Sequence, residues 1–301
     1  MNKKILSVRI FTTFAFLVAC ATFASAQATR TWISGVGDDA NPCSRTAPCK
    51  TLQGTISKTA TNGEMNILDP GGFGGVTINK SMTIDGGSFI AGVLVSGSNG
   101  IIINAANSVV TLRGLDINGL TTGLSGIRII NAKAVFIENC TIYGFQKGIA
   151  DERTTGGSLS VTNTVIKNNN VVNALIGGGS TPAIKAVFDN VQLKNSSTGI
   201  GLWASTGSTV SVINSVISGN FDKGVYAEET AIVDIQGGTI SFNDTGIQLE
   251  SGSPTVRISN VTITMNNVGV DVQGGSLDSY NNNKIAGNTA DGAVSRTIGF
   301  H

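Results

Sequence analysis

Three carboxylates lie on one predicted face of neighbouring sequence repeats, where their spacing could support chemistry. They are Glu228, Glu250 and Asp271. If the repeats stack about 4.8 Å apart, Glu228 and Glu250 lie on adjacent turns, and two carboxylates about 5 Å apart are the arrangement used in retaining glycoside hydrolysis. The same pair could instead hold a calcium ion or raise the pKa of one member. The three residues are therefore candidate catalytic residues; no cofactor is required, and calcium is the alternative.

The same predicted face carries aromatic and amide side chains. Counting from a glycine that begins each repeat, side chains at odd places point into the core and those at even places point outward. The outward residues expected to bind a ligand are Trp203, Tyr226, Glu228, Gln248, Glu250 and Asp271. Exposed aromatic rings beside carboxylates suit a sugar chain, which presents apolar faces and many hydroxyls. The rival interpretation is that Lys147, Lys223 and Arg257 screen the acids of a merely solvated surface.

Composition excludes several other kinds of chemistry. Charged residues make up 13% of the chain, and the formal net charge is +1. No basic run occurs beyond the N-terminus, so the electrostatic footprint of a nucleic-acid partner is missing. The single histidine, His301, is the last residue. This nearly excludes Ser-His-Asp and Cys-His catalysis and histidine-held metal sites.

Residues 1–26 predict a signal peptide and therefore a secreted or periplasmic protein. A positively charged start is followed by the apolar stretch 10–19, which is too short to span a bilayer, and by the small residues Ala24-Ser25-Ala26 at a cleavage site. An alternative is that the residues ending at Cys20 form a lipoprotein box, with Cys20 lipidated. No other segment approaches the length of a membrane span.

A repeat of about 23 residues organises the chain after this leader. Its glycine column consists of Gly126, Gly148, Gly199, Gly224, Gly246, Gly269 and Gly292, with Asn173 in the glycine place of one further repeat. Each glycine is followed by alternating apolar residues, as in Val225 and Ala227, which predicts a short strand with one buried face. Each repeat holds three such strands. A single repeat cannot bury them alone, whereas stacked repeats can.

Asparagines mark the predicted bends in two columns. One column is Asn139, Asn163, Asn190, Asn214, Asn260 and Asn282, and the other is Asn169, Asn220, Asn243, Asn266 and Asn288. Asparagine tolerates the left-handed conformation of a sharp bend, and stacked amides can hydrogen-bond from repeat to repeat. Three short strands with Asn and Gly corners predict an all-β, right-handed parallel β-helix of about nine to ten coils over residues 65–301.

Residues 27–64 are expected to form an N-terminal cap. The segment Thr51–Ala60 reads as a short amphipathic helix that would plug the open end of the core. In an oxidising compartment, Cys43 and Cys49 can form a disulfide across a short loop. Cys140 falls at an inward place and is expected to be buried.

The opening of the mature chain carries a family resemblance. Its segments Gly37–Thr51, Asn62–Gly71 and Ile78–Gly86, with the helix between the first two, resemble the start of bacterial secreted right-handed β-helix proteins of the pectin-lyase-like superfamily. The resemblance covers essentially the whole mature chain and implies the fold rather than an activity. Similarity to polygalacturonases would require a Gly-His-Gly motif, and this chain has no internal histidine. Alginate epimerases share an Asp-Pro-His-Asp type motif, whereas Asp69-Pro70 is followed here by Gly71-Gly72. Pectate lyases hold calcium with clustered aspartates, and no obvious cluster of three aspartates stands out in this sequence.

The sequence therefore predicts a secreted or envelope β-helix that presents a rigid wall for polysaccharide or surface binding. The alternative is a pectate-lyase-like polysaccharide lyase or glycoside hydrolase that acts on acidic glycans. A monomer is expected, although strand edges of the last coil, around Tyr280–Phe300, could stack end to end on another copy. The charged triplet Asp151-Glu152-Arg153 is expected to be a solvated corner.

Overall fold

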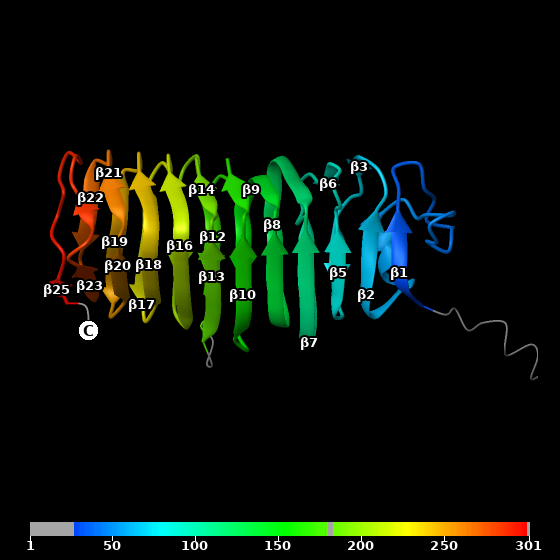
Figure 1. Cartoon of the computed structure of the whole chain (residues 1–301), viewed down its shortest axis with the longest axis horizontal. Coiled ribbons are helices and arrows are strands. Elements are labelled where there is room, and N and C mark those ends of the chain that lie inside the picture. The colour runs from blue at the N-terminus through cyan, green and yellow to red at the C-terminus, as the bar shows by residue number, and fades with distance from the viewer. Residues whose placement is uncertain (1–26, 178, 180–182, 300–301) are drawn as a thin grey trace, which may run out of the picture.

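Parallel strands stack along one axis in the part of the chain that the structure describes, residues 27–177, 179 and 183–299 (Figure 1). The computed structural model forms a solenoid whose N-terminal and C-terminal coils lie at opposite ends. The predicted signal peptide and Cys20 lie outside the described residues. No helix among the described residues is long and apolar enough to cross a membrane.

Three parallel sheets, named A, B and C here, make the walls of the solenoid. Sheet A contains, in order, β3 (Gly71–Gly72), β6 (Ala91–Leu94), the first parts of β8 (Leu115–Glu138) and β9 (Thr141–Asp151), β11 (Val165–Lys167), β14 (Gln192–Lys194), the last parts of β16 (Ser208–Ser218) and β18 (Ile232–Ser241), β21 (Thr262–Thr264) and β24 (Lys284–Ile285). Sheet B contains β4 (Val76–Ile78), the first part of β7 (Ile101–Arg113), the middle of β8, the end of β9, β12 (Val172–Ile176), β15 (Ile200–Ala204), β17 (Lys223–Glu229), β19 (Thr245–Gly252) and β22 (Val268–Val272). Sheet C contains β1 (Ala28–Ile33), β2 (Thr59–Ile67), β5 (Met82–Asp85), the ends of β7 and β8, β10 (Gly157–Thr162), β13 (Ile184–Asp189), the first parts of β16 and β18, β20 (Thr255–Ser259), β23 (Ser276–Tyr280) and β25 (Arg296–Ile298).

The core runs the length of the solenoid because every coil contributes apolar side chains at the same inward places. On sheet B, Val225 stacks between Leu202 and Ile247, and all three are fully buried. Each such side chain contributes about 1.5–3 kcal/mol by leaving water. The predicted all-β parallel helix is confirmed, and the nine rungs of sheet B agree with the lower end of the predicted coil number.

Five of the six asparagines of the first predicted column form left-handed bends between sheets C and A, and the sixth, Asn282, is not in the left-handed region. The φ angles of these five lie between 47° and 56°, and they are Asn139, Asn163, Asn190, Asn214 and Asn260. The glycine column also holds, with two exceptions. At the last coil, Asp291 rather than Gly292 lies beside Gly269. The contact is close, since a Cβ on Gly269 would meet the carbonyl oxygen of Asp291 at 2.6 Å. The second exception concerns Gly199 and affects the candidate site described below.

Asparagines of the second predicted column form a hydrogen-bonded ladder between sheets A and B, which is buried as far as Asn266 and partly exposed at Asn288. The amide of Asn220 donates to Asn243 at 2.9 Å, Asn243 donates to Asn266 at 3.1 Å, and Asn266 donates to Asn288 at 2.9 Å. Each side-chain oxygen also accepts from the backbone of the coil before it, as Asn243 does from the N–H of Asn220 at 3.1 Å. The ladder therefore satisfies buried polar groups at every bend that it crosses.

One coil has Ser196 where the ladder requires an asparagine, and Asn173 closes the gap. The amide of Asn169 donates to Asn173 at 2.9 Å, and Asn173 donates to Asn220 at 2.9 Å, so the chain of hydrogen bonds passes over the coil of Ser196. Asn173 is fully buried and lies in the glycine column. Asn173 in the glycine column thus compensates for Ser196 in the asparagine column.

We predict that Asn173→Gly alone lowers the free energy of unfolding by about 1–3 kcal/mol, because Asn169 and Asn220 lose buried partners. Ser196→Asn alone is expected to be destabilising because it crowds Asn173. The double variant restores the consensus repeat and should recover most of the loss. Urea unfolding of the four proteins forms a double-mutant cycle, and strictly additive effects would contradict the compensation.

Residues 27–64 contain a single short helix, α2 (Leu52–Ile56), rather than the predicted helix over Thr51–Ala60. Thr51 caps it by accepting a hydrogen bond from the N–H of Gly54 at 2.9 Å, and both Leu52 and Ile56 join the core. The prediction is wrong in length because the chain enters β2 already at Thr59, where parallel pairing with β1 satisfies its backbone. The role of this helical turn as a plug stays a prediction.

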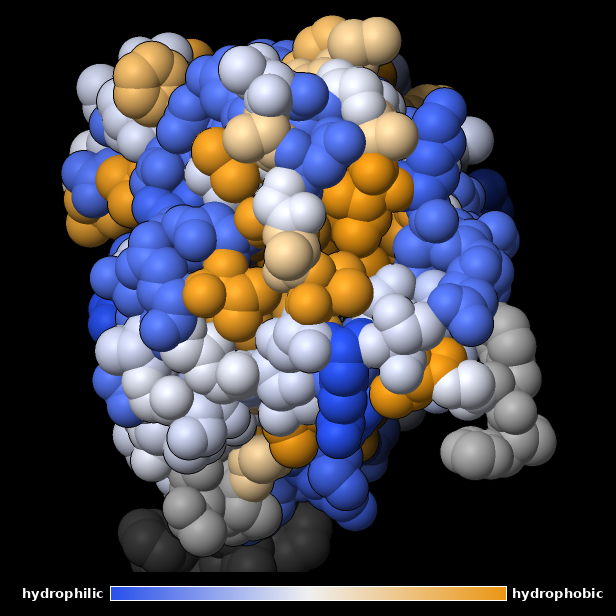
Figure 2. Space-filling model, turned by 90° about the vertical axis from the view of Figure 1, so that its left-hand side faces the viewer, coloured by the Kyte–Doolittle hydropathy of each residue, from blue (hydrophilic) through white to orange (hydrophobic). Residues whose placement is uncertain are grey.

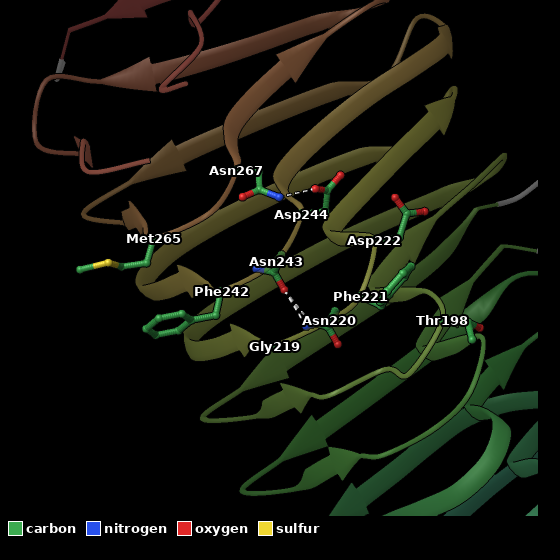
Figure 3. Close-up of a pocket in the computed structure, with 10 residues that line it drawn as sticks. All are labelled: Thr198, Gly219, Asn220, Phe221, Asp222, Phe242, Asn243, Asp244, Met265 and Asn267. Carbon is green, nitrogen blue, oxygen red and sulfur yellow. Dashed lines mark hydrogen bonds between the residues drawn. The ribbon is translucent and has the colours of Figure 1, made fainter. Parts of the chain in front are cut away.

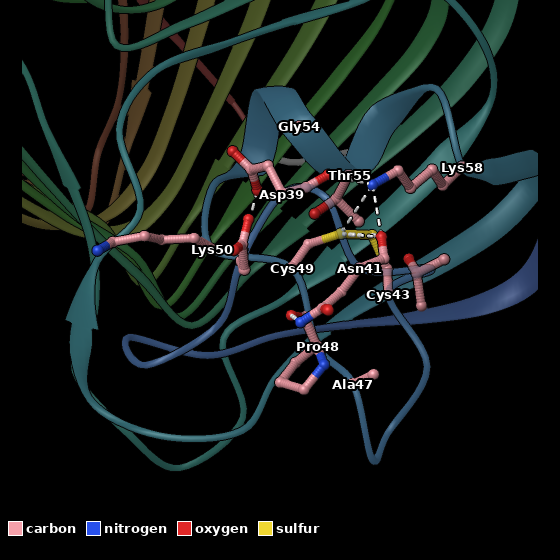
Figure 4. The surroundings of a disulfide bond; sticks show 12 residues. Asp39, Asn41, Cys43, Ala47, Pro48, Cys49, Lys50, Gly54, Thr55 and Lys58 are labelled. Atoms are coloured by element: carbon pink, nitrogen blue, oxygen red, sulfur yellow. Dashed lines mark hydrogen bonds between the residues drawn. A yellow bond between two sulfur atoms is a disulfide. The ribbon is translucent and has the colours of Figure 1, made fainter.

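A disulfide between Cys43 and Cys49 closes the loop next to this helical turn (Figure 4). Lys58 reaches the disulfide loop and donates to the carbonyl of Asn41 at 2.5 Å and to that of Asp39. Burial alone would raise the pKa of Asp39, but hydrogen bonds from the hydroxyl and N–H of Thr51 hold it below its usual value. Asp39 is therefore an anchor of the loop.

The predicted solvated corner at Asp151 and Arg153 is wrong, because both side chains are fully buried. Asp151 takes an inward place of sheet B between Ile129 and Ile176. Arg153 donates to both oxygens of Asp151, at 2.8 and 2.5 Å, and to the carbonyl of Ala132 at 3.1 Å. A charge on each partner satisfies the other, so the pair can lie in the core.

We predict that Arg153→Met destabilises the protein by about 3–5 kcal/mol, because it leaves the Asp151 carboxylate buried without a counter-charge. Adding Asp151→Ile removes that charge and continues the apolar row of its neighbours. The double variant should therefore be more stable than the single one in thermal unfolding. A double variant that is no more stable than Arg153→Met would contradict this account of the pair.

The C-terminal end of the solenoid presents apolar side chains at its centre (Figure 2). Val272, Ile285 and Val294 are partly buried there and pack against the core. At this end, Arg296 donates two hydrogen bonds of 2.7 Å to the buried Asp278, and these hold the pKa of Asp278 below its usual value. End-to-end association through this surface stays a prediction, as does the monomeric state.

Candidate functional site

Counting four places from Gly199, Gly224 and Gly246 predicts that Trp203 shares one row with Glu228 and Glu250, but the structure puts Trp203 in a different row of sheet B. It pairs with Tyr226 in the parallel register, so Gly201 rather than Gly199 corresponds to Gly224. A Cβ on Gly201 would meet the carbonyl oxygen of Gly224 at 2.6 Å, and Gly224 approaches the next coil equally closely. Two glycines lie two residues apart, and the sequence pattern selected the wrong one. The prediction that placed Trp203 in the row of the two glutamates is therefore wrong.

All six predicted ligand-binding residues nevertheless lie on four consecutive strands of sheet B. One outward row runs in register through Trp203, Tyr226, Gln248 and Asp271. The glutamates follow two residues after Tyr226 and Gln248 on β17 and β19. Ser205, two residues after Trp203, contacts the first of them. Stacking of the coils thus brings together side chains that are up to 68 residues apart, from Trp203 to Asp271.

The two aromatic rings pack edge to face, with centroids 5.5 Å apart and an interplanar angle of 68°. Trp203 is partly buried, but Tyr226 is only 8% exposed, so the expectation of two exposed rings is wrong for Tyr226. Val172, Ile200 and Leu175 pack beside them in a small apolar cluster separate from the core. Because this cluster fixes both rings, Trp203 presents one defined face.

Glu228 is held by three donors from the same face. Trp203 Nε1 and Ser205 Oγ donate to its Oε1 at 2.9 and 2.8 Å, and the hydroxyl of Tyr226 lies 3.1 Å from its Oε2. The same hydroxyl also contacts Oε2 of Glu250. A phenol has one proton, so Tyr226 donates to one glutamate at a time and links the two carboxylates.

The chemistry of Tyr226 is that of a neutral donor. Burial raises its pKa well above the ordinary value, and the hydrogen bond to Glu250 and the charge of Glu228 raise it further. A deprotonated phenolate beside two carboxylates would be strongly disfavoured. Tyr226 therefore cannot act as a base at neutral pH and instead orients the two glutamates.

Asp271 is engaged by two amides. Gln248 Nε2 and Gln273 Nε2 lie 3.1 and 2.7 Å from its Oδ2. The side-chain amide oxygen of Gln248, Oε1, is buried and has no hydrogen-bond partner in the structure. Among the described residues, no group of three or more His, Cys, Asp or Glu side chains is arranged to hold a metal ion. A calcium site here would have to draw on Glu228 and Glu250, although hard cations take six to eight oxygens.

The basic residues named in the rival interpretation pair with other acids. Lys147 Nζ lies 2.9 Å from Glu152, Lys223 lies 2.6 Å from Asp222, and Arg257 lies 3.1 Å from Asp234. Lys223 also lies 5.2 Å from the centre of the Tyr226 ring. Among the described residues, none of the salt bridges involves Glu228, Glu250 or Asp271.

Sequence reasoning missed a groove at the corner between sheets A and B. A cavity of about 770 Å³ opens there, beside the exposed side chains of Phe221, Phe242 and Met265 (Figure 3). A second cavity of about 710 Å³ continues along the corner and shares Gly219 and Phe221 with the first. The available signal was Phe and Met at positions where other coils have Gly or Asn.

The fold and the repeat define a parallel β-helix protein, and comparisons with known proteins agree. The chain belongs to the family described as right handed beta helix region, whose model matches residues 99–290. Pectate lyase Pel9A is similar in structure, with a TM-score of 0.57 and 14% identity over 85% of this chain and 70% of that chain. The A-module of mannuronan C-5 epimerase AlgE6 from Azotobacter vinelandii has a TM-score of 0.50 and 13% identity, over 83% of this chain and 93% of the module. At these identities the likeness shows the fold alone. No curated protein matches the sequence.

Proposed function

We propose that the outer face of sheet B binds a polysaccharide and does not turn it over. The observation that carries this proposal is the fixed arrangement of Trp203 against Tyr226, with the indole N–H tied to Glu228. Sugar rings present apolar faces to an aromatic ring and hydroxyls to carboxylates. The face offers both groups side by side on neighbouring coils.

Preorganisation supports binding at this face. The hydrogen bonds to Glu228 and the apolar cluster around Tyr226 fix the side chains before any ligand arrives. Little side-chain entropy is then lost on association, which favours affinity. The repeat adds one set of outward side chains per coil, about 4.8 Å further along the axis. Such a surface suits a chain-like ligand.

The contacts of Glu228 argue for binding rather than catalysis. Its Oε1 already accepts two hydrogen bonds, from Trp203 and Ser205, and its Oε2 lies 3.1 Å from the hydroxyl of Tyr226, which shares its one proton with Glu250. A carboxylate nucleophile needs an oxygen free to attack the sugar, and a general acid needs a proton directed at the leaving group. Here the donors of Trp203, Ser205 and Tyr226 are directed at Glu228 instead.

A lyase or hydrolase is the second candidate, and one observation favours it. Glu228 and Glu250 both contact the hydroxyl of Tyr226, so the two carboxylates lie close together on adjacent coils. The two structural neighbours are named as a pectate lyase and a mannuronan epimerase, which suits a glycan partner of either kind. In this case Glu250→Gln should abolish turnover and leave the fold intact.

The proposed location is secreted or periplasmic, with residues 1–26 removed as a signal peptide. The disulfide between Cys43 and Cys49 supports an oxidising compartment. Lipidation at Cys20 is the alternative, and the intact mass of the mature protein distinguishes the two.

We predict that Trp203→Ala raises the Kd for a bound glycan about tenfold, because a lost aromatic contact of about 1.4 kcal/mol changes affinity by that factor. Titrations would use the hexasaccharides of cellulose, xylan, mannan and chitin and a hexagalacturonate. The chain has two tryptophans. In Trp32→Phe, Trp203 is the only one left, so tryptophan fluorescence then reports ligand binding at Trp203 alone. Trp32→Ala is the matched control on sheet C. If Trp203→Ala binds every ligand of the wild type with unchanged affinity, the proposed face is wrong.

A further inference from the structure

We propose that the corner groove between sheets A and B is a separate binding site for an uncharged glycan chain. The inference goes beyond the sheet B face and rests on other residues. Here the groove is defined by Phe221, Phe242 and Met265, which flank it, and by Gly219, which opens it.

Two of these residues have a backbone conformation that their side chains disfavour. Phe242 and Met265 both have φ of 57°. The equivalent bends of other coils, directly after the sheet A strand, have Asn168, Asn195 and Gly219. Asn and Gly adopt the left-handed region readily, whereas bulky side chains there are rare and strained. Two consecutive coils therefore have strained residues where the repeat offers unstrained ones.

Burial does not compensate for this strain. Phe242 is 66% exposed and Met265 is 60% exposed, and Phe221 across the groove is 71% exposed. Strained residues that the fold does not need are characteristic of functional sites. An exposed phenyl ring gains free energy only when something covers it, so the three side chains point to a ligand.

The shape of the groove fits a linear ligand. Phe242 and Met265 lie on one side of it, Phe221 and Asp222 lie on the other, and the buried asparagine ladder lies below (Figure 3). Gly219 has no side chain, so a ring can lie above it between the two phenylalanines. The second cavity extends the groove past Gly219 toward the preceding coils. A ligand in both cavities would run along the solenoid axis.

The chemistry of the lining selects an uncharged glycan. Three apolar side chains on neighbouring coils are too small a surface for a protein partner, which buries about 800 Å² on each side. The other lining side chains are mainly amides, hydroxyls and carboxylates, which suit sugar hydroxyls. Neither cavity is lined by Lys or Arg, so the lining offers no cation to a uronate or a phosphate. Of the two aspartates that line the first cavity, Asp222 pairs with Lys223 and Asp244 accepts a hydrogen bond from Asn267, so the lining suits an uncharged chain.

The test uses Phe242→Asn and Met265→Asn, singly and together, in the full chain as it is expressed and processed. Asparagine accepts the left-handed bend, so thermal stability should stay the same or rise. Calorimetric titration with the hexaoses of cellulose, xylan, mannan and chitin measures binding, and hexagalacturonate is the charged comparison. Phe89→Asn, at an exposed phenylalanine in a turn outside the groove, is the matched control.

We expect at least one uncharged hexaose to bind the wild type. Its Kd should rise at least tenfold in the double variant and stay unchanged in Phe89→Asn. Trp203→Ala separates the two sites, because it should leave groove binding intact even if the proposal for sheet B fails. Unchanged affinity of the double variant for every ligand overturns the inference. So does a wild type that binds none of the uncharged probes, or one whose groove prefers hexagalacturonate.

Discussion

The stacking of each coil on the next is the constraint on which the rest of this structure depends. Parallel backbone hydrogen bonds set the distance between coils. At the bends between sheets A and B, the asparagine ladder from Asn169 to Asn288 pairs the polar groups that the strands leave without partners. The ladder tolerates little variation, because an unpaired buried amide is costly. The replacement at Ser196 is accordingly matched by Asn173, which carries the hydrogen bonds across the affected coil.

Fixed stacking converts sequence spacing into rows of side chains. Every outward place on a strand becomes a row along the axis, and its residues are free to vary because they support neither the core nor the ladder. On sheet B this freedom brings Trp203, Tyr226 and the two glutamates into contact. At the corner it puts Phe242 and Met265 beside the ladder, at bends where other coils have Asn or Gly. Both candidate sites are thus consequences of the same regular scaffold.

The periodic sequence made the fold predictable. The features that depart from the repeat could not be predicted in the same way. The strands, the inward places and both asparagine columns could be read from spacing because stacking forces each coil to repeat them. The row of Trp203 could not, since Gly199 and Gly201 both satisfy the pattern and only the register distinguishes them. The burial of Asp151 and Arg153 was missed because a charge at an inward place looks like a surface corner until its partner is seen. The hydrogen bonds of Glu228 depend on side-chain rotamers, which spacing does not encode.

The central functional claim is that this scaffold binds a glycan without cleaving it. Incubation of the processed protein with pectate, alginate, xylan, mannan and chitin oligosaccharides, with and without calcium, tests this claim most directly. Ultraviolet absorbance detects unsaturated uronate ends, and a reducing-end assay detects hydrolysis. The account predicts that neither signal rises above the no-enzyme rate while at least one oligosaccharide binds to the folded protein. Sustained formation of either kind of end, lost in Glu250→Gln, would contradict it and make Glu228 and Glu250 part of an active site.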